Sequence, residues 1–594
     1  MNRQFWRGIL ERYRLWIYDY QHVLERLFLL SAVILALASL GLLLWDVGFL
    51  HIEEERLLIR LWSTRLVALF LVHYFLRMVT SLHPIKYLRT HRFEWLLSLL
   101  ILLELGYWLA TGRGWITTFL SPGGYMFLVH LAMISFIFIE VSRQLQQVAA
   151  LPIKPAQLVV FSFLLLILMG TGLLMLPRAT VQEGSMPFLD ALFTATSAVC
   201  VTGLIVVDTA TYFTHTGHWI ILLLIQLGGI GVIAFATFLA ASAGDQPGLR
   251  HLVVLQGVFD VASLLEARSL LIRVVAVTLS IEGVGALLLF NSWKESFSSL
   301  YERMFFSLFH AVSAFCNAGF SLFSNGLADP VHAFNPALNL IIIVLIVLGG
   351  LGFGVLWETF ARFRLKQPIK KFSVHARIVW LMTGLLLLVG MIGFWILEIR
   401  PGGTLEGLGT MQQFLAALFQ SVTTRTAGFN TVDIAQISLP VVVLFVVLMF
   451  IGASPGSTGG GVKTTTFAVI ALYITTYFRG KQEVELFHRF LARRTLRKAL
   501  VSFAFAVSFI TLAIFLLTIT EPFSLADIIF EEVSAFATVG LSRGITGSLT
   551  ASGKGIIILS MFAGRVGMLT LAAALTRQVL STRYRYPEVT IGIT

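Results

Sequence analysis

The stretch Ser197-Ala-Val-Cys-Val-Thr-Gly203-Leu204 decides the fold, because the chain contains three more segments of the same pattern. The other copies read Ser313-Ala-Phe-Cys-Asn-Ala-Gly319-Phe320, Val422-Thr-Thr-Arg-Thr-Ala-Gly428-Phe429 and Ser534-Ala-Phe-Ala-Thr-Val-Gly540-Leu541. Successive glycines are 116, 109 and 112 residues apart. A turn glycine between packed helices explains one such segment, but four segments in register indicate an internal repeat.

Composition places the chain in a membrane. Of its 594 residues, 57% are hydrophobic and only 12% are charged, whereas a soluble globular protein carries about 25% charged residues. The net charge of +12 collects in loops on one side, which predicts that these loops and both termini are cytoplasmic, with no need for a nucleic-acid partner. Apolar runs long enough to span a bilayer are expected at residues 27–45, 61–80, 95–112, 123–139, 158–176, 219–243, 270–290, 337–357, 378–397, 439–478, 499–519 and 555–576.

Each copy of the repeat has the same order: an apolar span, an apolar stretch too short to cross, the glycine segment and a second span. We predict an all-α polytopic membrane protein with four tandem membrane helix–pore loop–membrane helix repeats around one pore. About four extra transmembrane helices precede them. The predicted domains are an N-terminal accessory domain at residues 1–150 and pore repeats at residues 151–245, 246–365, 366–480 and 481–594.

The four glycine segments should meet around a polar axis. Non-helical backbone at bilayer depth is tolerated only where it is buried in protein or lines a water-filled cavity. A ring of backbone carbonyls is how a cation selectivity filter replaces the water shell of an ion, and glycine supplies backbone conformations that other residues disfavour. The candidate filter residues are Cys200, Val201, Thr202, Gly203, Cys316, Asn317, Ala318, Gly319, Arg425, Thr426, Ala427, Gly428, Ala537, Thr538, Val539 and Gly540.

The apolar run at residues 439–478 is too long for one straight span. Its 40 residues would form a helix of about 60 Å, twice the hydrocarbon thickness. Five glycines and a proline interrupt its middle, which predicts a glycine-rich loop at 452–466 on the cytoplasmic side of the filter. The candidate gate residues of this loop are Gly452, Ser454, Pro455, Gly456, Ser457, Thr458, Gly459, Gly460, Gly461 and Lys463.

The other repeats carry glycines at equivalent positions, Gly228 to Gly231, Gly349 to Gly352 and Gly564 to Gly567, where we expect milder kinks or close helix packing. Arg565 lies inside the last span. A charge at this depth is costly and by default marks a functional site. We expect Arg565 to belong to the gate, as a positive barrier near the pathway below the filter; a snorkelling arginine is the alternative.

From about residue 151 to its end, the chain resembles the pore-forming subunit of the Trk/Ktr superfamily of potassium uptake systems, and the Ktr branch most of all. The likeness is carried by Thr196 to Phe213, Gly452 to Thr466 and Gly564-Arg565-Val-Gly. It implies K+ as the transported ion, bound at the filter carbonyls, and the glycine-rich loop as an intramembrane gate. In the family, serine in place of the first filter glycine is associated with sodium passage. All four glycines are present here, which favours potassium.

The resemblance also implies a homodimer in a bacterial cell membrane. Its partners would be cytosolic RCK-type nucleotide-binding regulatory subunits, through which adenine nucleotides act. Na+ would enter as a coupling or activating ion, although no sodium site can be read from the residues, and no covalent cofactor is expected. The basic loops at 362–377 and 479–498 suit either membrane lipid or an acidic regulatory partner.

The first 150 residues depart from the family pattern. The stretch from Tyr74 to Trp95 resembles, faintly, part of a voltage-sensor domain. A voltage sensor needs several charges on one moving helix, but residues 125–141 offer only His130 and Glu140. We therefore expect an accessory four-helix domain.

Several charged residues near the glycine segments have two interpretations. Asp190 and Asp527 begin pore helices, where a carboxylate caps a helix or attracts cations. Asp208 and Asp433 follow their glycines by five residues and either enrich cations at the outer mouth or are solvated loop charges. Arg425 should point away from the axis and brace the filter, because a lining cation would oppose conduction.

Two other classes of function would leave different marks in the sequence. A sodium- or proton-coupled secondary cation transporter with a midplane site would be marked by inverted repeats and paired broken helices, but these repeats share one orientation and show one strong break. A membrane enzyme would need clusters of intramembrane acids or histidines. Glu282 is the clearest buried acid of the pore part and stands alone, so the sequence predicts no enzyme.

Overall fold

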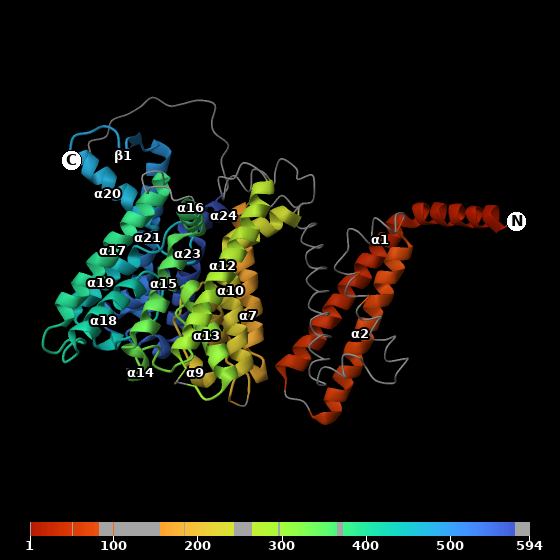
Figure 1. Cartoon of the computed structure of the whole chain (residues 1–594), viewed down its shortest axis with the longest axis horizontal. Helices are drawn as coiled ribbons and strands as arrows, with labels where there is room; N and C mark the ends of the chain where they lie inside the picture. The colour runs from red at the N-terminus through yellow and green to blue at the C-terminus, as the bar shows by residue number, and fades with distance from the viewer. Residues whose placement is uncertain are drawn as a thin grey trace. The chain divides into compact units, whose positions relative to one another are not determined.

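The computed structural model of the chain describes residues 2–49, 52–81, 95, 99, 155–182, 184–242, 264–294, 297–364 and 372–576 (Figure 1). It divides into two compact units, residues 1–152 with 176–178, and residues 153–175 with 179–594. In the first unit, α1 (Asn2–Gly48) and α2 (Glu53–Val79) pack through Ala32, Ala36 and Phe70. The expected spans at 95–112 and 123–139 lie outside the described residues apart from positions 95 and 99.

The second unit is built from helices in the order that the four repeats predict. Each repeat contributes a long first helix, a short pore helix and a second helix, which is broken in the last three repeats. The elements are α7 (Pro155–Leu174), α8 (Phe188–Val199) and α10 (His215–Ser242) in repeat 1; α12 (Leu264–Ser292), α13 (Leu300–Phe315), α15 (Pro336–Leu351) and α16 (Phe353–Arg364) in repeat 2; α17 (Val374–Glu398), α18 (Thr410–Thr423), α19 (Leu439–Phe450) and α20 (Thr464–Phe478) in repeat 3; and α21 (Arg493–Thr520), α22 (Leu525–Phe536), α23 (Ala551–Val566) and α24 (Met568–Leu575) in repeat 4.

Short elements join these helices. One group lies in the loops that follow the pore helices and the loop before α8, and a small antiparallel hairpin connects α20 to α21. These elements are η1 (Pro177–Ala179), α9 (Thr209–Tyr212), α14 (Pro330–Ala333), η3 (Ile434–Gln436), η4 (Thr546–Ser548), β1 (Glu485–Leu486) and β2 (Arg489–Phe490). In Figure 1, α9 and α14 lie at the opposite end of the second unit from α20 and β1.

The described helices are those of a multi-pass membrane protein. Six of them are long and apolar enough to cross a membrane, or eight if each of two sharply bent helix pairs counts as one span. The pore helices α8, α13, α18 and α22 have 12, 16, 14 and 12 residues. At 1.5 Å per residue they reach at most about 24 Å, less than the roughly 30 Å hydrocarbon core.

The helix breaks differ from the sequence prediction. The break inside 439–478 is present, but the non-helical loop covers residues 451–463 because α20 begins at Thr464. The prediction of milder kinks is wrong in two repeats: α15 and α16 meet at 108° around Gly352, and α23 and α24 at 97° around Gly567. Both glycines have positive φ, which ends a helix abruptly. Gly231, with φ 44°, interrupts α10 as well. The alternative, close packing, is confirmed at Gly228, Gly349 and Gly564, where an added Cβ would lie 2.0 Å or less from a carbonyl oxygen at the end of a pore helix.

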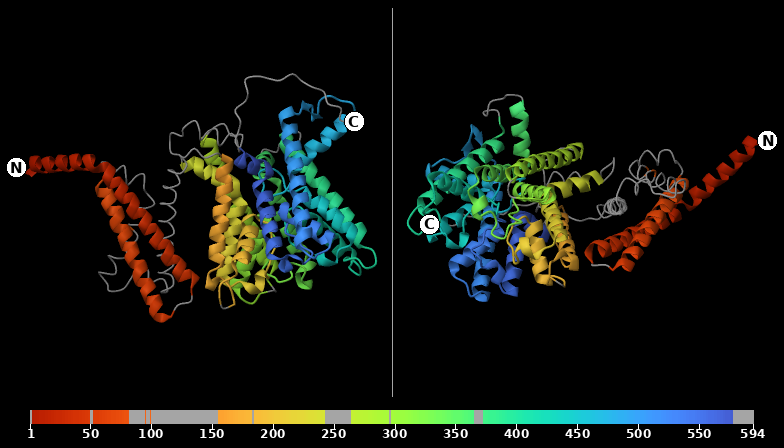
Figure 2. Two further views of the ribbon diagram at one scale, coloured as in Figure 1. Left: turned by 180° about the vertical axis from the view of Figure 1, so that it is seen from behind. Right: turned by 60° about the horizontal axis from the view of Figure 1, so that its bottom comes forward.

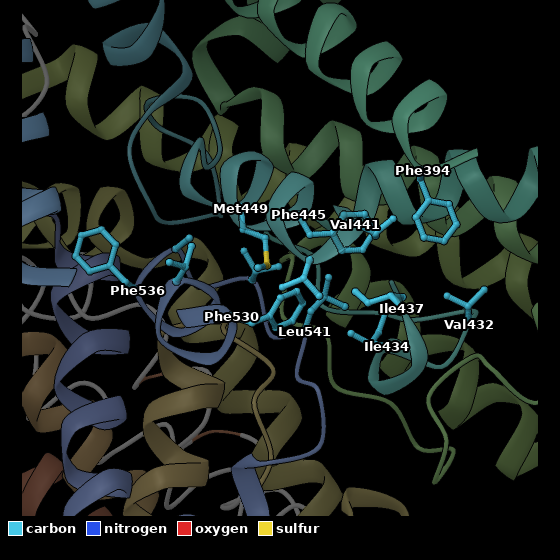
Figure 3. Packing of buried hydrophobic residues seen from close by; sticks show 14 of the residues in the cluster. Phe394, Val432, Ile434, Ile437, Val441, Phe445, Met449, Phe530, Phe536 and Leu541 are labelled. Carbon is cyan, nitrogen blue, oxygen red and sulfur yellow. The ribbon is translucent and has the colours of Figure 1, made fainter. Parts of the chain in front are cut away.

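Apolar clusters hold neighbouring repeats together. The cluster between repeats 3 and 4 contains Phe394, Phe445, Phe530, Val539 and Leu541, all at most 1% exposed. Figure 3 shows Met449 of α19 beside Phe530 and Leu541 of the fourth repeat. Lipid tails are as apolar as these side chains, so close van der Waals packing, rather than removal from water, holds the pore helices in place.

Repeat 4 also packs against repeat 1, although it is the last along the chain. Helix α23 contacts α8, and α24 contacts α7. The blue helices lie next to the orange ones in Figure 2. The side-chain amide of Gln157 donates to the Ala574 carbonyl at 3.1 Å. The four repeats therefore close into a ring.

Candidate functional site

The four repeat glycines, Gly203, Gly319, Gly428 and Gly540, form a closed ring, called here the glycine ring. Each glycine lies so close to the next repeat that an added Cβ atom would fall less than 3.0 Å from a carbonyl oxygen. The carbonyl is always that of the residue before the next glycine: Gly203 faces Ala318, Gly319 faces Ala427, Gly428 faces Val539 and Gly540 faces Thr202. The ring brings together segments that are more than one hundred residues apart in the sequence.

The backbone of the ring alternates in handedness. The glycines have φ between 70° and 92°, and the residues two positions before them also have positive φ: Val201 50°, Asn317 57°, Thr426 71° and Thr538 52°. Alternation of left-handed and ordinary residues allows successive carbonyl groups to face one side. Residues with a Cβ disfavour this conformation, so the surrounding structure must impose it. Sequence reasoning placed all four of these residues in the candidate filter but did not predict their positive φ.

The pore helices hold this strained backbone through hydroxyl groups. Ser197 and Ser534 accept hydrogen bonds from the amides of Gly203 and Gly540, at 3.0 and 3.1 Å. In the middle repeats the bond is reversed: the hydroxyl of Ser313 donates to the Phe320 carbonyl at 2.8 Å, and that of Thr423 to the Phe429 carbonyl. All four hydroxyls are fully buried or nearly so, so each bond forms away from competing solvent.

A cavity of about 580 Å³ opens on one side of the glycine ring, and all four glycines line it. Asp208 and Asp433 line it too, but each is engaged locally: Asp208 accepts from the Ala210 amide at 3.1 Å and Asp433 from the Ala435 amide at 2.9 Å. Their carboxylates therefore cap short helices and still contribute negative charge to the cavity wall.

The two aspartates in the first turns of the pore helices form ion pairs. Asp190 pairs with Lys554 of α23 at 2.6 Å, and Asp527 pairs with Arg543 at 2.7 Å. Neither residue is the N-cap: Pro187 precedes α8, and Ser524 caps α22. The Asp190–Lys554 pair connects repeat 1 to repeat 4.

The glycine-rich loop, residues 451–463, lies against the other side of the glycine ring. The Gly460 amide donates to the Thr538 hydroxyl at 2.9 Å, and the α-carbon of Gly459 packs closely against the Thr426 side chain. The loop also contacts repeat 2, where the Thr458 amide donates to the Gly349 carbonyl at 3.3 Å. Its two ends meet in an isolated parallel bridge between Ile451 and Val462.

Three cationic side chains donate to carbonyl groups of this loop or its flank. Arg425 donates to the Gly452 carbonyl at 3.4 Å and Lys463 to the Gly459 carbonyl at 2.8 Å. Arg565 donates to the carbonyls of Thr458 and, in repeat 1, Gly228. None of the ion pairs among the described residues involves these three cations. The glycine-rich backbone of the loop is therefore surrounded by three positively charged side chains.

The buried acids of this region are more numerous than the sequence prediction held. Glu282 accepts from Gln226 at 3.1 Å and from the Cys316 thiol at 3.6 Å, and neither partner is an acid. Glu531 and Glu532 of α22 are 1% and 0% exposed and accept from Thr546 and Ser560 respectively. The sequence did contain a signal for this pair, namely two adjacent acids in a short apolar helix. No group of three or more acids, histidines or cysteines within the described ranges could hold a metal ion.

Other predicted site residues lie at the ends of pore helices or in the glycine-rich loop. Cys200 and Cys316 end α8 and α13 and are buried free thiols. In the loop, the Ser454 hydroxyl bonds that of Thr464 at 3.1 Å, the Ser457 hydroxyl donates to the Ser454 carbonyl at 2.6 Å, and Gly456 accepts from the Phe353 amide at 3.0 Å.

Comparison with known proteins places this geometry among cation transporters. The profile of the TrkH family, described as cation transport protein, matches residues 125–583. The chain is 39% identical to the Ktr system potassium uptake protein B of Vibrio alginolyticus over 73% of its own length and 94% of the relative's. It is 37% identical to the potassium/sodium uptake protein NtpJ of Enterococcus hirae over 74% of its own length and 97% of the relative's. The crystal structure of the potassium transporter TrkH from Vibrio parahaemolyticus superposes with a TM-score of 0.55 at 20% identity, covering 70% of this chain and 84% of that one.

Proposed function

The chain belongs to the TrkH family of cation transport proteins, and from this premise we propose that it takes up potassium across the membrane through one pathway along the axis of the four repeats. An ion enters the outer cavity, sheds water at the carbonyl groups of the glycine ring and passes the glycine-rich loop. The closed contact of the four glycines with the next repeat carries the proposal, because only a ring can surround an ion with carbonyls. The chain is a transport protein and not an enzyme.

The proposed filter consists of the residues from Cys200 to Gly203 and their counterparts in the other repeats. Its test is potassium and sodium flux in proteoliposomes for the intact chain and for Gly203→Ser. The added side chain meets the Ala318 carbonyl and must displace part of the ring, so potassium preference should fall at least tenfold, which corresponds to about 1.4 kcal/mol. Gly555→Ser is the matched control, because a Cβ atom added at Gly555 would have no other atom within 4 Å. Unchanged selectivity in Gly203→Ser would refute the filter.

The glycine-rich loop is the proposed gate. It contacts Thr538, Gly349 and Arg565 of two other repeats, and Arg565 and Lys463 add a positive barrier to cations below the ring. Deletion of residues 456–461 should raise basal potassium flux without lowering selectivity. A shortened loop that leaves flux unchanged would show that the loop is not the gate.

Regulation and assembly belong to the same proposal. Ktr system proteins are the relatives at 39% identity and high coverage, which supports a homodimer, cytosolic RCK-type subunits and control by adenine nucleotides through those subunits. Pore repeats at 151–245, 246–365, 366–480 and 481–594, and cytoplasmic termini in a bacterial membrane, complete the arrangement. Native mass measurement should find twice the 65.9 kDa chain.

A second candidate is uptake of potassium coupled to sodium. The name of the Enterococcus hirae relative, potassium/sodium uptake protein, favours it, as do the sharp helix breaks at Gly352 and Gly567, since broken helices are typical of secondary transporters. Potassium influx that requires external sodium, and that carries sodium with it in a fixed ratio, would support coupling over a gated pore.

A further inference from the structure

A small cavity lies beside the third glycine segment and shares no lining residue with the outer cavity. Its walls come from α15, α17 and the end of α18, and they include Gly350, Thr383 and Arg425. The centre of a water-sized particle has about 10 Å³ in which to move. That space suits one water molecule or one monatomic ion and excludes larger ligands.

Two hydrogen-bond donors in this cavity have no partner. Arg425 is 6% exposed, and its Nη1 atom has no acceptor among the described residues, whereas Nη2 donates to the Gly452 carbonyl. Thr383 is 7% exposed, and its hydroxyl also has no partner within the described ranges. A guanidinium can only donate, and a threonine hydroxyl can donate as well. The missing ligand is therefore an acceptor.

Charge decides which acceptor fits. Arg425 has no carboxylate within ion-pair distance in the part of the chain that the structure describes. A water molecule would complete the hydrogen bonds, but it would leave a buried cation without a counter-charge, which protein interiors avoid. Lys463 and Arg565 add two further cations near the same loop. We propose that the cavity binds a single halide-class anion between Arg425 Nη1 and Thr383 Oγ1.

Such an anion would act on the loop through Arg425. It holds the guanidinium between α15 and α17, while Nη2 keeps its bond to the carbonyl of Gly452, next to the start of the loop. Loss of the anion frees the guanidinium to turn and weakens this bond. Anion binding at this site does not depend on the proposed function. Only the effect of the anion on potassium flux rests on the proposed function.

The first test is diffraction from crystals of the full chain grown in potassium bromide, with data collected at the bromine absorption edge. The expected result is an anomalous peak between the Arg425 and Thr383 side chains. Ordinary water density there without an anomalous signal would overturn the proposal.

The second test compares thermal unfolding of the full chain in potassium chloride and potassium gluconate at constant potassium. Chloride should raise the unfolding temperature of the intact protein. Thr383→Val keeps the shape but removes a donor to the anion, so it should weaken the apparent chloride affinity about tenfold. Thr278→Val is the matched control: Thr278 is also buried with an unpartnered hydroxyl but does not line the cavity. Equal chloride responses in both variants would refute the site.

These readouts separate the two proposals. Bromide binding and chloride-dependent unfolding do not require ion transport, so they can succeed while potassium uptake fails. Conversely, selective potassium flux with no bromide peak would reject the anion site alone.

Discussion

At the scale of single residues, the glycine ring depends as much on hydroxyl groups as on glycines. Ser197, Ser534 and Thr538 bind amides that the strained backbone leaves without helical partners. A buried amide without an acceptor costs about 1–3 kcal/mol. Each hydroxyl therefore stabilises one conformation of the ring or of the loop below it.

Thr538→Val should open the pathway partially. The valine cannot accept from the Gly460 amide, which loses its 2.9 Å hydrogen bond. The loop should lose about 1–3 kcal/mol of stability in its present position, and basal potassium flux should rise roughly tenfold. Flux from proteoliposomes without regulatory subunits measures this.

Thr278→Val is the control for this change, because the Thr278 hydroxyl is buried and has no partner among the described residues, and Thr278 belongs neither to the glycine ring nor to the loop. It should leave basal flux nearly unchanged. If both variants leak equally, the Gly460 hydrogen bond does not restrain the loop.

At the scale of elements, the second helix of every repeat is interrupted. Repeats 1, 2 and 4 use a single glycine with positive φ, at Gly231, Gly352 and Gly567, whereas repeat 3 uses a whole loop. The corner at Gly352 supports that loop: the Phe353 amide donates to Gly456, and the Gly352 α-carbon packs against the Pro455 carbonyl.

Gly352→Ala tests whether this corner supports the loop. The alanine would have φ near 93°, and its Cβ would lie 2.6 Å from the Pro455 carbonyl, so the corner or the loop must shift at a cost of about 1–3 kcal/mol. Basal potassium flux should increase and the unfolding temperature should fall.

Gly354→Ala provides the comparison, since Gly354 is helical and has nothing within 4 Å of the added atom. Alanine favours helix over glycine by about 1 kcal/mol, so this variant should be neutral or slightly stabilising. A leak in Gly354→Ala as large as in Gly352→Ala would contradict the proposed support.

At the scale of the whole molecule, the site exists because the last repeat meets the first. Gly540 faces Thr202, Arg565 donates to Gly228, and Lys554 pairs with Asp190. Of these contacts, the ion pair is the one in which both partners are side chains, so each partner can be replaced in turn.

Lys554→Met should lower the free energy of unfolding by about 1–3 kcal/mol, because it leaves the largely buried Asp190 carboxylate without its cation. Lys554→Met combined with Asp190→Asn should recover part of that loss. Chemical denaturation in detergent, analysed as a double-mutant cycle, measures the coupling.

Lys481→Met should change stability by less than about 0.5 kcal/mol, because its ion pair with Glu485 is exposed. If the Lys554 and Lys481 variants lose equal stability, the bridge between repeats 1 and 4 adds nothing to ring closure.

The membrane class, the four repeats, the glycine positions and the break inside 439–478 can all be read from the residues without coordinates. These features are one-dimensional: a repeat needs only similar residues at regular spacing, and a span needs only apolar length. Arg565 also stood out, because a charge inside an apolar run is visible without coordinates.

How those parts contact one another depends on the folded arrangement of the four repeats. The positive φ of Val201, Asn317, Thr426 and Thr538 has no local signal, since surrounding contacts impose it. Neither the 108° corner at Gly352 nor the contact of Arg565 with Gly228, 337 residues away, can be read from spacing. Both depend on which helix surfaces come into contact once the ring has closed. Those contacts are set by side-chain packing over many residues and not by a single motif.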